Sequence, residues 1–168
     1  SSDLCILLAG TECDILKGGK LDFADSVLAE LDYVIASIHA GFSSDEKDNT
    51  DRLIRAMENP LVTCLGHPTG RLLLEREPYP VNLPKVLEVA ATTGTWIELN
   101  CNPWRLDLDW RWWHCARDLG DLCCINPDAH KTEQRRFLDI GVTVARKGWL
   151  RAQDVVNTRT LPQLRKLL

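Results

Sequence analysis

The stretch Leu7–Leu16, LLAGTECDIL, places an acidic residue at the end of an apolar run. A run of this kind predicts a buried strand, and Glu12 follows it where the chain is expected to turn. The same arrangement returns three times: VIASIH ends at His39, VTCLGH ends at His67, and LCCINPDAH ends at Asp128 and His130. A carboxylate or an imidazole therefore follows strand after strand.

The rest of the chain alternates short apolar segments with helical patterns. Strands are expected at 4–9, 33–38, 61–65, 95–100 and 121–126, with a further strand near 142–145, and helices at 50–58, 82–94, 109–119 and from Thr132. Apolar strands that alternate with helices are typical of an α/β fold with a parallel sheet covered on both faces. Functional groups gather at the carboxyl ends of such strands, so the polar residues above are expected to meet at one rim.

Composition indicates an ordinary globular protein. The 168 residues are 45% hydrophobic and 26% charged, and their number suits one domain over residues 1–168. No apolar run is long enough to cross a bilayer and no signal pattern begins the chain, so a cytoplasmic location is expected. The seven cysteines include no C-x-x-C motif, and those at 5, 64, 123 and 124 lie in apolar runs, which predicts buried reduced thiols.

Charge is distributed unevenly along the chain. The net charge is −4, yet residues 131–168 contain nine Lys or Arg and only three Asp or Glu. A basic segment is able to contact phosphates. Amphipathic helices with solvated basic faces explain the same charge, and on charge alone this simpler explanation is favoured.

The residues at the predicted rim share one chemistry. Imidazoles combined with carboxylates suit Zn, Mn or Fe, whereas Ca or Mg favours oxygen ligands alone. A metal held there would lower the pKa of a bound water and bind a phosphoryl oxygen, as phosphoester hydrolysis requires. Arg71, in GHPTGR, is a candidate phosphate contact, and a salt bridge explains its presence equally well.

The tryptophan-rich segment from Asp109 to Leu119 allows two interpretations. Trp110, Trp112 and Trp113 are able to stack bases, but their near-helical spacing favours packing of a helix on the sheet. His114 lies beside them and is expected to pack or to lie at the surface.

Six segments, which together cover nearly the whole chain in order, resemble the PHP (polymerase and histidinol phosphatase) family. The resemblance is greatest to the C-terminal PHP domain of bacterial family X DNA polymerases. The segments are GTECDILKGGKLDF, LDYVIASIHAGF, NPLVTCLGHPTGRLL, IELNCNPWRLDL, INPDAH and GVTVARKGWLRAQDVVNTRTLPQLRKLL.

This resemblance implies an irregular (β/α)7 TIM-like barrel with up to three metal ions. It implies that Glu12 bridges two metals and that His39 and His67 complete one of these sites. It further implies that Asp128 and His130 bind the other metals, with Glu12, Asp128 and Arg71 acting in catalysis.

The family pattern also contains ligands that are missing upstream of Glu12. The family begins with a His-x-His motif and two further ligands, but residues 1–11 contain no His. The chain is therefore expected to be the C-terminal portion of the domain, without the first barrel strands, and to hold one metal ion or none. An open sheet edge would favour a homo-oligomer that buries it.

Three functions are compatible with these features. The first is a phosphoesterase module of a family X DNA polymerase that acts on DNA ends in repair, as a 3′-5′ exonuclease or 3′-phosphatase. The second is a phosphatase for a small phosphate ester such as histidinol phosphate. The third is a degenerate PHP scaffold without catalysis, which the missing ligands favour for this polypeptide as it stands.

Overall fold

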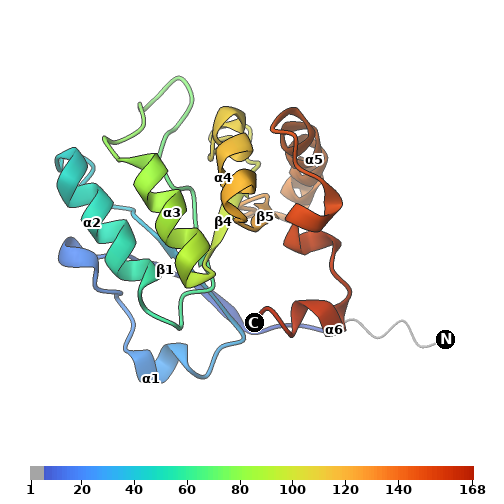
Figure 1. The fold of residues 1–168 in the computed structure, drawn as a ribbon, viewed down its shortest axis with the longest axis horizontal. Helices are drawn as coiled ribbons and strands as arrows, with labels where there is room; N and C mark the ends of the chain where they lie inside the picture. The colour runs from blue at the N-terminus through green and yellow to red at the C-terminus, as the bar shows by residue number, and fades with distance from the viewer. Residues whose placement is uncertain (1–5) are drawn as a thin grey trace.

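The computed structural model describes residues 6–168, which form a sheet of five parallel strands (Figure 1). The strands lie in chain order across the sheet, and each pairs in parallel with the next. They are β1 (Gly10–Asp14), β2 (Tyr33–Ser37), β3 (Cys64–Leu65), β4 (Trp96–Asn100) and β5 (Cys123–Asn126). The predicted α/β class is confirmed, and the parallel sheet fits a partial TIM-like barrel.

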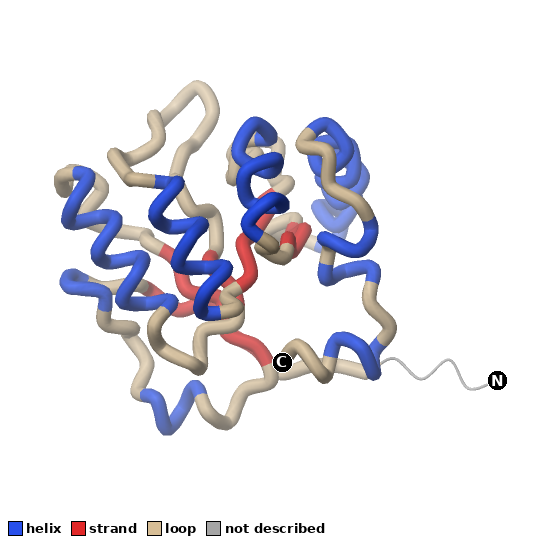
Figure 2. The backbone as a smooth tube through the Cα atoms, viewed as in Figure 1, coloured by secondary structure: helices blue, strands red, loops and turns tan. Residues whose placement is uncertain are grey.

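Four helices stand in a row along one face of this sheet (Figures 1 and 2). They are α2 (Glu46–Met57), α3 (Leu83–Thr93), α4 (Trp113–Leu119) and α5 (Leu138–Lys147). The short helix α1 (Asp25–Leu28) precedes β2, and α6 (Leu161–Leu164) ends the chain beside the segment that leads into β1. No helix within residues 6–168 is both long and apolar enough to cross a membrane.

Helix α3 shows why the sequence pattern located the helices well. The side chain of Asn82 caps its start by accepting a hydrogen bond from the Lys85 amide at 3.1 Å. Gly94 ends it in the left-handed conformation, with φ of 77°, and donates its amide to Ala90. Because the apolar residues recur every three or four positions, Val86, Leu87 and Ala90 are all buried.

The first predicted strand, 4–9, is wrong in its position. Residues 1–5 lie outside the described part of the chain, Ile6–Ala9 belong to no strand, and Leu7 is 87% exposed. The strand instead begins at Gly10, because pairing with β2 starts at the contact between Gly10 and Tyr33. Glu12 therefore lies within a strand, not after one.

The predicted strand near 142–145 is also wrong, because these residues belong to helix α5. Its β-branched residues favour a strand locally. Packing decides otherwise: Gly141 lies so close to the sheet that an added Cβ would come within 2.4 Å of Ile125. The buried residues Gly141 and Ala145 are four positions apart, so packing follows the helical period and overrides the local preference.

The two faces of the sheet differ in what covers them. The face toward the helices carries the main core, which includes Leu65, Ile97 and Leu99. The opposite face carries a smaller cluster around Trp96 and Cys124. This cluster borders an apolar hollow of about 220 Å³ beside α6. In a closed barrel this second face would be the interior.

The two edges of the sheet differ in whether another segment hydrogen-bonds to them. At β5, the Asn157 side chain bonds to both the amide and the carbonyl of Ile125, at 2.7 and 2.9 Å, and so occupies the place of a further strand. At the opposite edge, β1 pairs with β2 on one side, and on its other side no strand among the described residues pairs with it. The association of two copies through this edge stays a prediction.

The predicted buried thiols are confirmed where the structure describes them. Cys13, Cys64, Cys101, Cys123 and Cys124 are buried and free. Cys5 lies outside the described residues.

Candidate metal centre

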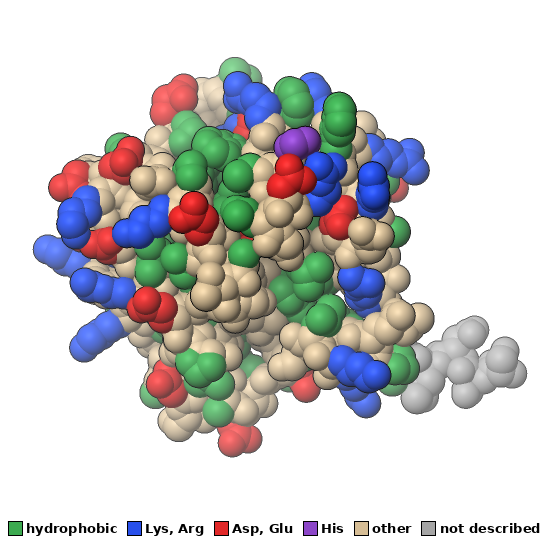
Figure 3. Space-filling view, in the orientation of Figure 1, with side chains coloured by type: hydrophobic (Ala, Val, Ile, Leu, Met, Phe, Trp, Pro, Cys, Tyr) green, Lys and Arg blue, Asp and Glu red, His purple; other side chains and the backbone are tan. Residues whose placement is uncertain are grey.

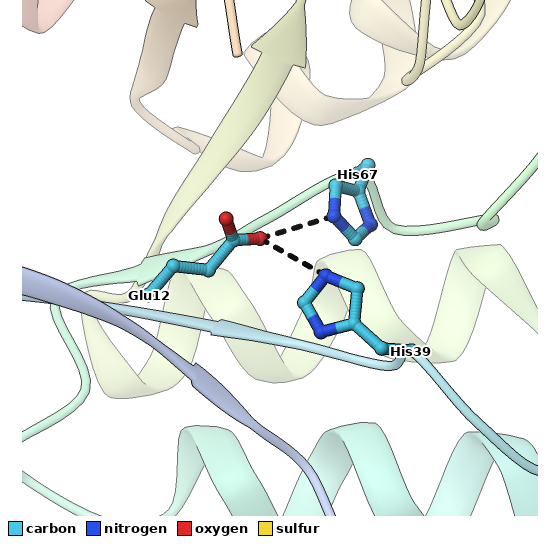
Figure 4. A group of neighbouring side chains, drawn as sticks. All are labelled: Glu12, His39 and His67. Carbon is cyan, nitrogen blue, oxygen red and sulfur yellow. Dashed lines mark ion pairs between the residues drawn. The ribbon is translucent and has the colours of Figure 1, made fainter. Parts of the chain in front are cut away.

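Three neighbouring strands bring Glu12, His39 and His67 together (Figure 4). Glu12 lies in the middle of β1, and the two histidines follow β2 and β3 by two residues. Because parallel strands end at the same edge, one ligand atom from each residue lies within 4.8 Å of the others. The Nε2 atoms of His67 and His39 lie 3.0 and 3.5 Å from the same Glu12 oxygen.

A glycine allows β2 to pack closely against the residue before His67. An added Cβ at Gly66 would lie 2.3 Å from Oγ of Ser37 and 2.7 Å from Cγ2 of Ile35, whereas its 3.6 Å distance from Oε1 of Glu12 is an ordinary contact. The residue before His67 therefore has to lack a side chain if these side chains of β2 are to keep their places beside the cluster.

A second carboxylate orients His39. Its Nδ1 lies 2.6 Å from Oδ1 of Asp14, which leaves Nε2 directed toward Glu12. Carboxylates commonly fix the ring and tautomer of a metal-binding histidine in this way. Asp14 was not predicted from the sequence, although it lies two residues after Glu12 and so on the same side of the strand.

A buried glutamate holds the backbone of His67. His67 is itself buried and has an unusual positive φ of 24°. Its amide donates to Oε2 of Glu98 at 2.7 Å. Glu98 was also missed from the sequence, although a carboxylate in the apolar run TWIELN is the same signal that identified Glu12.

Glu98 also joins this cluster to the end of β5. Its Oε1 accepts from Asn126 at 2.9 Å, and its Oε2 from Asn100 at 3.3 Å. Asn100 donates as well to Asp128, at 3.1 Å. The pKa of Glu98 is raised, because burial outweighs the opposing effects of the nearby His67 ring and of the hydrogen bonds from Asn126 and the His67 amide. Since all its partners donate, the ionised carboxylate fits this network.

Asp128 and His130 lie outside the three-residue cluster. Among residues 6–168, Glu12, His39 and His67 form the one group of three ligand-type side chains close enough to share an ion. The Asp128 carboxylate is held by Arg105 at 3.0 Å, and the His130 side chain is 79% exposed. Their predicted roles as metal ligands stay predictions.

The guanidinium of Arg71 is bound within the protein. Nη1 lies 2.9 Å from Asp109, Nε donates to the Arg105 carbonyl, and Nη2 donates to the Leu106 carbonyl. The salt bridge that the sequence left open is therefore present. A contact between Arg71 and a phosphate stays a prediction.

The charges of the cluster explain its protonation. The two histidines hold the pKa of the Glu12 carboxyl well below its usual range, chiefly through the hydrogen bond from His39. In turn, the bond to Glu12 raises the pKa of His39 to about 9. At neutral pH the metal-free cluster therefore contains an ionised carboxylate and a protonated His39.

Metal binding to this cluster is expected to depend on pH. Because the pKa of His39 is about 9, a metal ion that binds at lower pH must displace a proton from this ring. The apparent affinity of the cluster for the metal should therefore rise about tenfold per pH unit between about pH 6 and 8. Calorimetry with Mn²⁺ in two buffers of different ionisation enthalpy would measure one proton released per ion. An affinity that stays constant over this range would contradict the expectation.

The donor set itself fits a transition metal. Two imidazole nitrogens and one carboxylate oxygen, on three adjacent strands, match the ligands that Zn, Mn and Fe prefer. Three protein ligands also leave coordination positions open for water and substrate. No cysteine takes part, which is more typical of a catalytic site than of a structural one.

Comparison with known proteins finds relatives of two kinds. No family model matches the chain. The DNA polymerase/3′-5′ exonuclease PolX of Bacillus subtilis is 43% identical over 162 residues, which are 96% of this chain and 28% of that protein. A protein of Thermoanaerobacter sp. named "Probable phosphatase" is 29% identical over 162 residues, 90% of this chain and 64% of that protein.

Another protein named "Probable phosphatase", from Caldanaerobacter subterraneus, is 38% identical over 98 residues, 56% of this chain and 36% of that protein. The chain thus spans less than two thirds of each of these relatives. Similarity to both kinds of protein confirms the resemblance found in the sequence motifs. The chain is thus similar to a family X DNA polymerase and to probable phosphatases, which is consistent with a PHP domain related to the family X polymerases.

Proposed function

We propose that this chain is a metal-dependent phosphoesterase module that hydrolyses phosphoester bonds at DNA ends, as a 3′-5′ exonuclease or 3′-phosphatase. The observation that carries the proposal is the convergence of Glu12, His39 and His67 within 4.8 Å. The relatives named as an exonuclease and as phosphatases support the phosphoesterase class. The polymerase relative supports DNA as the partner. Repair as the setting is a further part of the proposal.

Each residue of the cluster has a distinct part in this proposal. Glu12, His39 and His67 would hold a divalent Mn, Zn or Fe ion. When bound, the ion supplies a nucleophilic hydroxide at neutral pH and neutralises charge on the phosphoryl group. Asp14 keeps the Nε2 of His39 directed toward Glu12, and Glu98 fixes the backbone of His67.

The residues at the end of β5 extend the proposed site. Asp128 and His130 would bind further ions, up to three in a complete domain of this family. The link from Glu98 through Asn100 to Asp128 supports this, because it ties both groups into one network. Arg71 would contact the phosphate only if its guanidinium left Asp109.

Two alternatives rest on other observations. Relatives named "Probable phosphatase" favour a small phosphate ester as substrate. A non-catalytic scaffold is favoured by the engagement of Asp128 with Arg105 and by the exposure of His130, which leave one three-residue cluster among the described residues.

The experiment that separates these functions compares three substrates. The chain would be incubated with Mn²⁺, Zn²⁺ or Fe²⁺ and with 3′-labelled single-stranded DNA, a 3′-phosphorylated oligonucleotide or histidinol phosphate. Hydrolysis at the DNA ends is the expected result. Hydrolysis of the small ester alone would support the phosphatase, and bound metal without hydrolysis would support the scaffold.

A further inference from the structure

Two exposed tryptophans border a hollow between the start of α4 and the end of α5. Trp149 is 68% exposed and Trp110 is 38% exposed. With Arg111, His114, Lys147 and Gly148 they line a hollow of about 210 Å³. Large aromatic side chains gain free energy from burial, so an exposed pair around a hollow is a candidate binding site.

The backbone holds Trp149 in place. Gly148 lies so close to the buried Trp113 that an added Cβ would come within 2.7 Å of its Cβ. Trp149 itself has φ of 66°, a conformation that is unfavourable for a bulky residue. Its carbonyl accepts a hydrogen bond from Arg117 at 3.2 Å. The exposed ring is therefore presented by a strained turn, and such strain is concentrated at functional positions.

Basic and imidazole side chains lie beside these rings. Nζ of Lys147 lies 4.5 Å from the centre of the Trp110 ring, and the His114 ring meets Trp149 edge-on at 5.8 Å. Arg146 and Arg151 flank the turn, and Figure 3 shows basic side chains along the surface near α5. A ligand that suits this hollow has a flat aromatic face and a negative charge.

We propose that the hollow binds single-stranded DNA, with a base stacked on Trp149 and a backbone phosphate near Lys147. Aromatic side chains interleaved with cations are the usual means of binding single strands without sequence preference. This inference rests on the proposed function, since it supplies the strand whose end would be hydrolysed. The basic segment 131–168 then contributes more than a solvated helix face.

Two ion pairs connect the hollow to Arg71, in the loop that follows His67. Arg111 binds Asp109 at 2.8 Å, and Arg71 binds the other oxygen of Asp109 at 2.9 Å. Arg71 belongs to the loop that begins at His67, four residues earlier. A strand held in the hollow would thus lie against the segment that is joined to the loop of the metal site.

The test is a titration of a fluorescein-labelled oligo(dT) with the metal-free chain, followed by fluorescence anisotropy. Trp149→Ala is expected to weaken binding by about 5- to 100-fold, as loss of one stacked base would. Trp104→Ala is the matched control, because Trp104 is 61% exposed but does not line the hollow, and it should leave binding unchanged. Lys147→Ala should reduce the slope of log affinity for oligo(dT) against log salt concentration by about the amount that one phosphate contact contributes.

The possible outcomes separate the inference from the proposed function. Equal affinity of the wild type, Trp149→Ala and Trp104→Ala, or no oligo(dT) binding at low salt, would overturn the inference. Trp149→Phe should restore much of the affinity, because it keeps an aromatic face, and this excludes a folding defect as the cause. DNA binding that persists in a chain without hydrolysis would support the hollow while removing the proposed reaction.

Discussion

Replacing Glu12 with glutamine is expected to weaken transition-metal binding by about 100-fold or more. Changes in residues that only support a ligand cost roughly 10- to 100-fold in metal affinity, and Glu12 lies at the centre of the cluster. The amide has the same shape but no charge, and its NH₂ group cannot bind a metal. Both histidines would then face a neutral group in place of the oxygen that lies 3.0 and 3.5 Å from them.

Metal content by elemental mass spectrometry, with calorimetry using Mn²⁺, would measure this effect. Glu30→Gln is the control. Glu30 is exposed on the turn before β2, so this substitution removes the same charge at a place away from the cluster. Any hydrolysis of DNA ends should disappear with the metal. If Glu12→Gln bound Mn²⁺ as tightly as the control, the cluster would not be the metal site.

The sequence predicted the helices better than the first strand, for a physical reason. Helix α3 carries its own cap, apolar period and stop signal in Asn82–Gly94, so nothing distant is needed to locate it. The position of β1 depends on its partner: the described part of the apolar run before Gly10, residues 6–9, belongs to no strand, and pairing begins opposite Tyr33. Likewise, packing of Gly141 and Ala145 at the helical period overrides the local preference in α5.

The same distinction applies to the metal centre. His39 and His67 each follow an apolar strand, so a local pattern in a parallel sheet was enough to place them at one rim. Glu98 supports His67 only because β3 and β4 pair with Cys64 opposite Trp96, which sets Gly66 opposite Glu98. That register joins residues about thirty positions apart, and no local pattern records it.

The network around Glu98 also makes the site depend on one buried carboxyl group. The carboxylate accepts from the His67 amide on one oxygen and from Asn126 on the other. A backbone with positive φ at His67 is maintained only while its surroundings support it. Glu98 is therefore a positioning residue. It acts on the metal centre through the backbone of His67, whereas Glu12 faces the Nε2 atoms of His39 and His67.

Glu98→Gln is expected to weaken Mn²⁺ binding by about 10- to 100-fold and to destabilise the fold by about 1–3 kcal/mol. Glutamine keeps one acceptor oxygen, but its NH₂ group would face either the His67 amide or Asn126, both of which donate. Where the NH₂ group faces the His67 amide, that buried donor is left without an acceptor and the His67 ring loses its fixed position. Calorimetry of Mn²⁺ binding and thermal unfolding would measure the two effects.

Asn126→Ala distinguishes positioning from general loss of stability. It removes the partner of Oε1 and leaves the bond between Oε2 and the His67 amide in place. Both variants should lower the unfolding temperature, but only Glu98→Gln should lower the metal affinity by tenfold or more. Equal losses of metal affinity in the two variants would show that Glu98 supports the fold as a whole, because the oxygen that binds His67 would then have no special part in the site.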